Sequence, residues 1–226
     1  MALRPRKNLV QHLGHQLVTG PASEPVTLEQ VRAFLREPPV EDNAFITDCI
    51  IEARQIFEAT TGIACISQTW KLTLDHWPGG GREPWWEGTV QLPRSELSRG
   101  SADYVALPRY PLIDVGSVTT YDLDNTAASV TVADVFFLDM ASFPGRMILN
   151  TGETWPTALR DRNAIEIEYE AGFGADASAV PATIKRAIAQ TAGYLYENRG
   201  TGCSALFALK ETGALQIAGE YARVRL

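Results

Sequence analysis

Few side chains in this sequence could carry acid–base or metal chemistry. The chain has three histidines, His12, His15 and His76. His12 and His15 have the spacing of two metal ligands on one helix face, but their segment lacks helical periodicity and has no cysteine or acidic ligand nearby. His76 follows a predicted strand beside Trp77, where packing or surface exposure is the expected role. A Ser-His-Asp or Cys-His arrangement in the folded part would depend on His76 alone, so we predict neither a metal site nor a catalytic residue.

The cysteines also argue against a chemical site. Cys49, Cys65 and Cys203 are odd in number, widely spaced and include no Cys-X-X-Cys pair. Zinc sites and disulfide frameworks require closely spaced or paired cysteines, so the sequence predicts neither. The pattern instead favours a reducing compartment.

The remaining candidates for a binding or catalytic site are two glycine-rich segments and one acidic strand. The glycines at 79–81 lack the Lys-Ser/Thr pair of a phosphate-binding loop, and the Gly-Phe-Gly at 172–174 has no third glycine in register. Alternating acids occupy one face of the strand predicted at 164–169 and just beyond it: Glu166, Glu168 and Glu170. Paired carboxylates can hydrolyse glycosides, but alternating acids on a strand more commonly face solvent. We therefore predict no cofactor and no enzyme activity.

The composition is that of an ordinary globular protein. The 226 residues are 45% hydrophobic and 21% charged, which is sufficient for a substantial core. No apolar run approaches the roughly 20 residues of a membrane helix, so no membrane partner is expected. The net charge of −7 argues against general nucleic-acid affinity. Residues 1–20 carry three basic residues and no acid, and we interpret residues 1–25 as a flexible basic arm.

The first secondary-structure elements that the sequence predicts are helices. Thr27 and Gln30 form a capping-box pattern at the start of a short helix, and residues 41–61 have the period of a long helix that ends at Gly62. Helical period returns after Pro181. We predict that the apolar stripes of these helices form one core, in which Phe45, Cys49, Ile56 and Phe57 face Leu35, Ile184, Ile188 and Leu195.

Between these helices the apolar period changes to two, which is typical of strands. The predicted strands are 69–74, 89–92, 104–107, 115–121, 130–138, 146–149 and 164–169. The predicted fold class is therefore α+β: a small α-helical bundle (26–62 plus 180–200) with an inserted antiparallel β module (63–179), sandwich-like or barrel-like, and a C-terminal tail. The tail, 201–226, contains one predicted short helix at 204–212 and is otherwise irregular.

Tryptophans cluster around the glycine-rich loop. Trp77, Trp85 and Trp86 lie on both sides of residues 79–81. Such a group is either an interaction surface or a cap on the open end of the β module, and the sequence does not separate the two interpretations.

A set of short matches, in conserved order, resembles the head–tail connector (adaptor) proteins of long-tailed double-stranded DNA phages and gene transfer agents. The resemblance covers about residues 26–200. The matching segments are 26–36, 53–54, 58–62, 67–72, 107–112, 155–156, 167–174, 180–185 and 196–199. Residues 1–25, 78–103 and most of 201–226 depart from the pattern, so nothing is carried over to them except the Tyr/Arg-bearing end of the tail.

The resemblance implies a virion protein of the neck. Such proteins form a ring, usually of twelve copies, beneath the portal protein. The ring extends the DNA channel without specific DNA recognition and provides the docking platform for the next connector (the stopper) or a tail component. The family's C-terminal segment grips the portal, which implies a portal contact for Tyr221, Arg223, Val224, Arg225 and Leu226. The apolar members can serve as anchors, and the arginines can bind carboxylates.

Two alternatives of other classes remain open. One is a hydrolase or carbohydrate-active module with an unrecognised site, which requires a deep pocket with converging polar groups. The other is a nucleic-acid-binding protein, which requires a basic surface stripe. With 20 basic against 27 acidic residues, that stripe is not expected.

Overall fold

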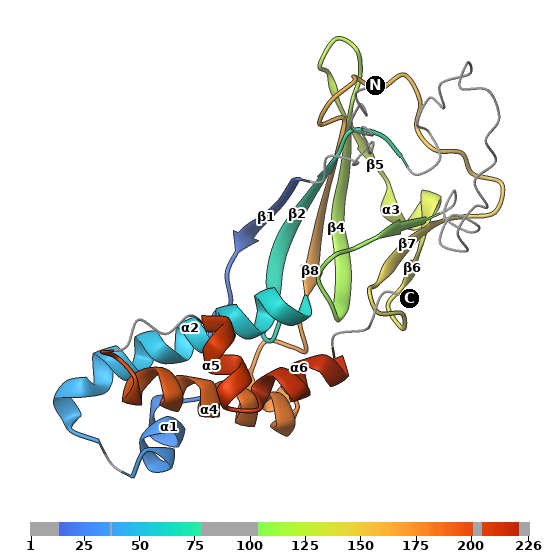
Figure 1. Ribbon diagram of the computed structural model, residues 1–226. Helices are drawn as coiled ribbons and strands as arrows, with labels where there is room; N and C mark the ends of the chain where they lie inside the picture. Colours follow the sequence, from blue (N-terminus) through green and yellow to red (C-terminus); the bar gives the residue numbers. More distant parts are fainter. Residues whose placement is uncertain (1–13, 37, 78–103, 201–204, 222–226) are drawn as a thin grey trace, which may run out of the picture.

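The computed structural model describes residues 14–36, 38–77, 104–200 and 205–221 and has an α+β fold. Helices gather at one end of the molecule and two antiparallel sheets at the other (Figure 1). The predicted α+β class is confirmed. The two sheets are open and separate, so the β module is not a closed barrel. The predicted strand at 89–92 lies outside the described residues, as do Trp85 and Trp86.

The first helix, α1 (Leu28–Phe34), begins as its sequence predicts. The backbone N–H of Gln30 donates to Thr27 Oγ1 at 3.3 Å, and the backbone N–H of Thr27 donates to Gln30 Oε1 at 3.1 Å. This is the reciprocal capping box, which satisfies two N–H groups of the first turn. The buried side chain of Val31 then fixes α1 on the rest of the bundle.

The central pair of the bundle is α2 (Asn43–Thr61) and α4 (Ala182–Glu197), which pack against each other. A short 3-10 turn, η1 (Val40–Asp42), leads into α2, and a second, η4 (Ala177–Ala179), precedes α4. Gly62 ends α2 with φ +82°, a left-handed conformation that favours glycine. The long helix and its C-terminal stop are thus as predicted.

Most of the residues predicted for the helical core lie in one hydrophobic cluster. Buried members are Cys49, Phe57, Ile184, Ile188 and Leu195, with Ile56 and Leu35 partly buried against them. The prediction that Phe45 lies in the core is wrong, because this residue is 38% exposed. Its ring lies at the rim, 6.1 Å from that of Tyr196. The buried face of α2 begins one residue later, at Ile46, which is fully buried.

The end of the chain corrects a second prediction. The short helix α5 (Ala205–Glu211) is as expected, but residues 214–221 are not irregular; they form helix α6 (Ala214–Tyr221). Ala214 and Ala218 of α6 are fully buried in the helical core. The partly buried Ile217 and Tyr221 pack against the same core. The four residues form an i, i+3, i+4, i+7 stripe of only two turns, which is short for recognition of a helix from sequence.

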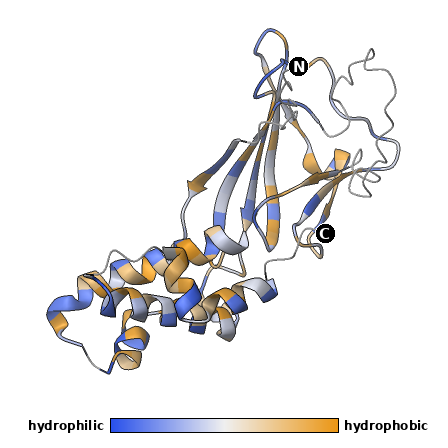
Figure 2. Cartoon of the chain, in the orientation of Figure 1, coloured by the Kyte–Doolittle hydropathy of each residue, from blue (hydrophilic) through white to orange (hydrophobic). Residues whose placement is uncertain are grey.

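The larger sheet has the strand order β1-β2-β8-β4-β5, with all neighbours antiparallel. Its strands are β1 (Gly14–Thr19), β2 (Gln68–Leu74), β4 (Leu112–Tyr121), β5 (Ala127–Val130) and β8 (Ile165–Ala171). Residues of β2 and β8 alternate between buried and half-exposed, and Figure 2 shows polar and apolar residues alternating along the long strands. This alternation is the predicted pattern of a sheet with one face on a core.

Strand β1 was not predicted, because residues 1–25 were interpreted as a flexible arm. Gly14–Thr19 instead pairs with β2 at the edge of the sheet. Most of its side chains are exposed, so its stability comes from the backbone ladder and not from an alternating apolar pattern. An edge strand of this kind gives almost no periodic signal.

The smaller sheet has the order β3-β7-β6 and covers the second hydrophobic core. Its strands are β3 (Tyr104–Ala106), β6 (Phe136–Asp139) and β7 (Arg146–Leu149). The single strand predicted at 130–138 is wrong, because one turn of helix, α3 (Val132–Val135), separates β5 from β6. Asn150 fixes this turn through bonds to the backbone of Asp134 and Val135, both of 2.9 Å.

Candidate functional site

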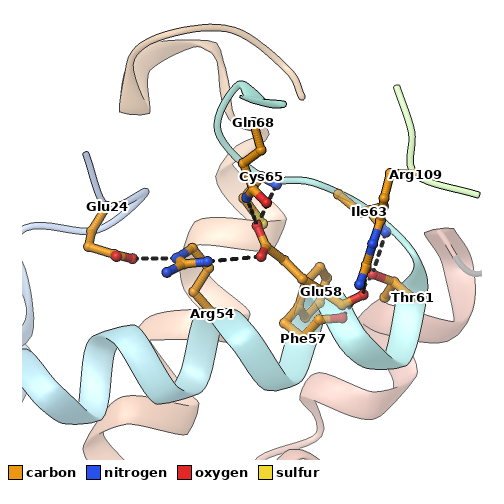
Figure 3. A network of polar contacts seen from close by, with 9 residues as sticks. All are labelled: Glu24, Arg54, Phe57, Glu58, Thr61, Ile63, Cys65, Gln68 and Arg109. Carbon is orange, nitrogen blue, oxygen red and sulfur yellow. Dashed lines mark hydrogen bonds and ion pairs between the residues drawn. The ribbon is translucent and has the colours of Figure 1, made fainter. Parts of the chain in front are cut away.

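A buried polar network joins the helical bundle to the larger sheet (Figure 3). At its centre is the Glu58 carboxylate of α2, which accepts bonds from the Arg54 guanidinium at 2.9 Å, from the backbone N–H of Cys65 at 2.8 Å and from the Gln68 amide at 2.8 Å. Arg54 also donates to Glu24 at 2.8 Å. Arg54 and Glu58 are only 6% and 5% exposed. The network therefore connects the segment before α1, helix α2 and the start of β2.

The charges of this network compensate one another. Burial would lower the pKa of Arg54, but the hydrogen bonds and negative charges of Glu24 and Glu58 outweigh it and raise that pKa. Each buried charge thus has an opposite charge in direct contact, which buried ions require. The arrangement holds segments together and offers no open position for a substrate.

A second segment, between β3 and β4, forms hydrogen bonds with the C-terminal end of α2. Arg109 donates from its guanidinium to the carbonyl of Glu58 at 2.7 Å, and Tyr110 donates its hydroxyl to the carbonyl of Thr61 at 2.6 Å. The Arg109 guanidinium also stacks on the Trp70 ring at 4.5 Å. The Thr61 carbonyl is one that the helix end leaves without an intrahelical partner, whereas the Glu58 carbonyl also accepts from the Gly62 N–H at 2.9 Å. The segment 107–112, which resembles the connector family, thus has a clear structural role.

His15 fastens β1 to the sheet. Its ring stacks on Trp70 with 4.5 Å between centroids, and its Nε2 lies 2.8 Å from the Tyr169 hydroxyl. Partial burial, aided by the positive charge of Arg109, lowers the pKa of His15 to about 4. The imidazole is therefore neutral at pH 7. His15 lies on a strand, not on the helix that a metal pair with His12 would need, and His12 is outside the described residues.

The cysteines of the described chain are not reactive thiols. Burial raises the pKa of Cys49 to about 11. Burial, with a further contribution from the Glu58 charge, raises the pKa of Cys65 still more. Both thiols stay protonated at neutral pH, and a protonated thiol is a poor nucleophile and metal ligand. Cys203 lies outside the described residues.

The acidic strand face is neutralised in part by a lysine. Lys71 Nζ of β2 lies 3.2 Å from Glu166 and 3.1 Å from Glu168 of β8. These side chains are partly exposed on the outer face of the sheet, which matches the solvated interpretation of the sequence. Within the described ranges, no three His, Cys, Asp or Glu side chains are grouped so as to hold a metal ion. No helix among the described residues is long and apolar enough to cross a membrane.

The aromatic group near the glycine loop belongs in part to the core. Trp77 is buried and stacks on Trp155 with 4.6 Å between ring centroids. Its indole N–H donates to the carbonyl of Pro156 at 3.1 Å. The interpretation of Trp77 as a cap on the β module therefore has direct support, whereas the sequence alone had left both interpretations open.

Of the residues predicted to contact the portal, the described chain contains only Tyr221, at the end of α6. Arg223, Val224, Arg225 and Leu226 lie outside the described residues. Beside Tyr221 is a cavity of about 230 Å³. Sequence reasoning missed this cavity, because its walls come from five separate parts of the chain. It also missed the polar network around Glu58 that joins the bundle to the sheet (the junction), since the spacing of Arg54 and Glu58 does not reveal their burial.

Comparison with solved structures shows the same fold in particles of gene transfer agents (GTAs). A chain from the neck of an empty GTA particle, obtained with C6 symmetry, has a TM-score of 0.65 and 22% identity, covering 88% of this chain and 94% of that one. A chain from the virion of a native GTA particle has a TM-score of 0.68 and 21% identity, covering 94% and 96%. A third, from a native GTA neck with C12 symmetry, has a TM-score of 0.59 and 21% identity, covering 88% and 94%. No protein-family profile and no curated protein matches the chain.

Proposed function

We propose that this protein is a head–tail connector (adaptor) in the neck of a phage or phage-like particle. The observation that carries the proposal is the shared fold over nearly the whole chain with chains from GTA necks and a GTA virion. The residue-level resemblance, in segments 26–200, points independently to the same class. The role is structural and not enzymatic: copies form a ring, of about twelve by family resemblance, beneath the portal.

The contacts between the helical bundle and the larger sheet suit a subunit of a ring. Helical bundle and sheet are joined by bonds from Glu58, Arg109 and Tyr110, so one subunit can present two ends in a fixed orientation. In the proposed role, one end meets the portal and the other offers the platform for the stopper or a tail component. The net charge of −7 fits a channel that lets DNA pass without gripping it.

The C-terminal residues are the proposed portal contact: Tyr221, Arg223, Val224, Arg225 and Leu226. The position of Tyr221 supports this assignment, because α6 ends with Tyr221 half-buried at the bundle surface. Removal of residues 222–226 leaves α6, including the buried Ala214 and Ala218, intact. A truncation at residue 213 would instead remove part of the core.

The test uses the full-length protein and portal-closed, DNA-filled heads that lack a neck, from the particle that encodes the chain. Cryo-electron microscopy is expected to show a closed ring beneath the portal, with a channel wide enough for duplex DNA. A variant ending at Tyr221 is expected to fold but to lose attachment. Failure of the full-length protein to attach to such heads would refute the connector role. Normal attachment of the truncated variant would refute the assignment of the tail alone.

A further inference from the structure

An apolar cavity lies where the helical bundle, the larger sheet and the β6–β7 hairpin meet. Its volume is about 230 Å³, and it is lined by Ile63, Tyr110, Phe143, Phe173, Glu220 and Tyr221. Ile63 and Tyr110 are buried, whereas Phe143 is 39% exposed. The ring of Phe143 packs edge-on against that of Tyr110, with 5.6 Å between centroids. An aromatic side chain half-exposed beside an apolar hollow leaves hydrophobic surface that a further apolar group can cover.

The chain leaves α6 at the rim of this cavity, and two hydrogen bonds fix the point of exit. The Tyr221 hydroxyl lies 2.8 Å from Thr183 Oγ1 of α4. The Tyr221 carbonyl lies 3.1 Å from the Tyr110 hydroxyl, whose one hydrogen it shares with the Thr61 carbonyl at 2.6 Å. Side chain and backbone of Tyr221 are thus both held at the cavity wall.

The five residues that follow have the matching chemistry. Ala222, Val224 and Leu226 alternate with Arg223 and Arg225, so an extended segment has one apolar and one basic face. Five extended residues span up to about 17 Å, which is ample to cross a hollow of this size. The exposed carboxylate of Glu220 at the cavity edge has the charge that the basic face requires.

We propose that residues 222–226 dock into this cavity of their own chain in the free subunit. Val224 and Leu226 cover Ile63, Phe143 and Phe173, and the arginines stay at the surface near Glu220. The docked tail adds a direct contact between α6 and the β6–β7 hairpin to the indirect one through Tyr110, which contacts both Tyr221 and Phe143. The proposal concerns the isolated protein and does not depend on attachment to heads.

Disulfide trapping tests the contact. Phe143→Cys is combined with Val224→Cys in a Cys203→Ser background, which leaves only the buried Cys49 and Cys65, and the protein is treated with a mild oxidant. The expected result is an intramolecular 143–224 link, at least tenfold faster than in a matched pair of Leu123→Cys and Val224→Cys. Leu123 is 71% exposed and lies in the β4–β5 turn, far from α6 (Figure 1).

Two results would overturn the proposal: equal rates for both pairs, or links that join different chains and place the tail on a neighbouring copy. A second measurement avoids changes in the folded part. Amide hydrogen exchange in residues 222–226 of the unaltered chain is expected to be at least tenfold slower than in a Val224→Asp, Leu226→Asp variant. Equal exchange in the two proteins would likewise overturn the proposal. Neither result bears on ring formation at the portal, so the two proposals fail separately.

Discussion

Substitution of Glu58 by alanine is the sharpest test of the junction. The change removes the acceptor of three hydrogen bonds, all from buried groups: the backbone N–H of Cys65, the Arg54 guanidinium and the Gln68 amide. Arg54 keeps its 2.8 Å contact with Glu24, so its charge is only partly uncompensated. Breaking a buried ion pair destabilises by about 3–5 kcal/mol, and an orphaned buried N–H contributes about 1–3 kcal/mol.

Because Glu24 retains half of the Arg54 pairing, we expect Glu58→Ala to lower the free energy of unfolding by about 3–5 kcal/mol in total. Urea denaturation followed by tryptophan fluorescence measures the loss. Glu52→Ala is the matched control, since Glu52 is on the same helix but exposed, and its effect is expected within about 0.5 kcal/mol. A loss below about 1 kcal/mol for Glu58→Ala would refute the view that the network holds bundle and sheet together.

Four other outcomes are expected. Phe57→Ala removes a fully buried ring and is expected to destabilise by about 3–5 kcal/mol in the same urea assay. Gly172→Ala places a Cβ 2.6 Å from backbone at φ +151°, so we expect a loss of about 1–3 kcal/mol, measured by thermal denaturation. The pKa of His15 is about 4 in the folded state against 6.5 unfolded, so the stability from its neutral form is complete above pH 6.5 and falls as pH drops toward 4. The protection factors of the β1 amides, after division by the intrinsic exchange rate at each pH, are expected to fall over that window, and constant protection factors would contradict this. Finally, the 143–224 disulfide is expected to block attachment to heads, with recovery on reduction, because one tail cannot occupy its own cavity and the portal together.

The sequence predicts the long periodic elements well. Helix α2 and strands β2 and β8 each bury one regular face with large apolar residues, so hydrophobic period alone locates them. Capping chemistry at Thr27 and the left-handed position of Gly62 then fix helix ends from local interactions. These features are visible because the physical cause lies within a few residues of its effect.

The missed elements have causes that lie elsewhere in the chain. Strand β1 is held by backbone pairing to β2 and by the contacts of His15 with Tyr169 and Trp70, partners more than fifty residues away. Helix α6 buries Ala214 and Ala218 and packs Ile217 and Tyr221 on the same core, but its stripe covers only two turns and is easily overlooked in the sequence. The spacing of Arg54 and Glu58 is that of an ordinary surface pair, and only the tertiary fold reveals their burial.

The attachment of α2 at two places has a mechanical consequence. A helix attached to a sheet through a single contact can rotate about that contact. Here the start of β2 holds the Glu58 side chain, while Arg109 and Tyr110 hold the last carbonyls of the same helix. Both segments contact the last turn of α2, so we expect them to limit its rotation against the sheet. We expect a force applied to the strands to be transmitted to the bundle through these bonds.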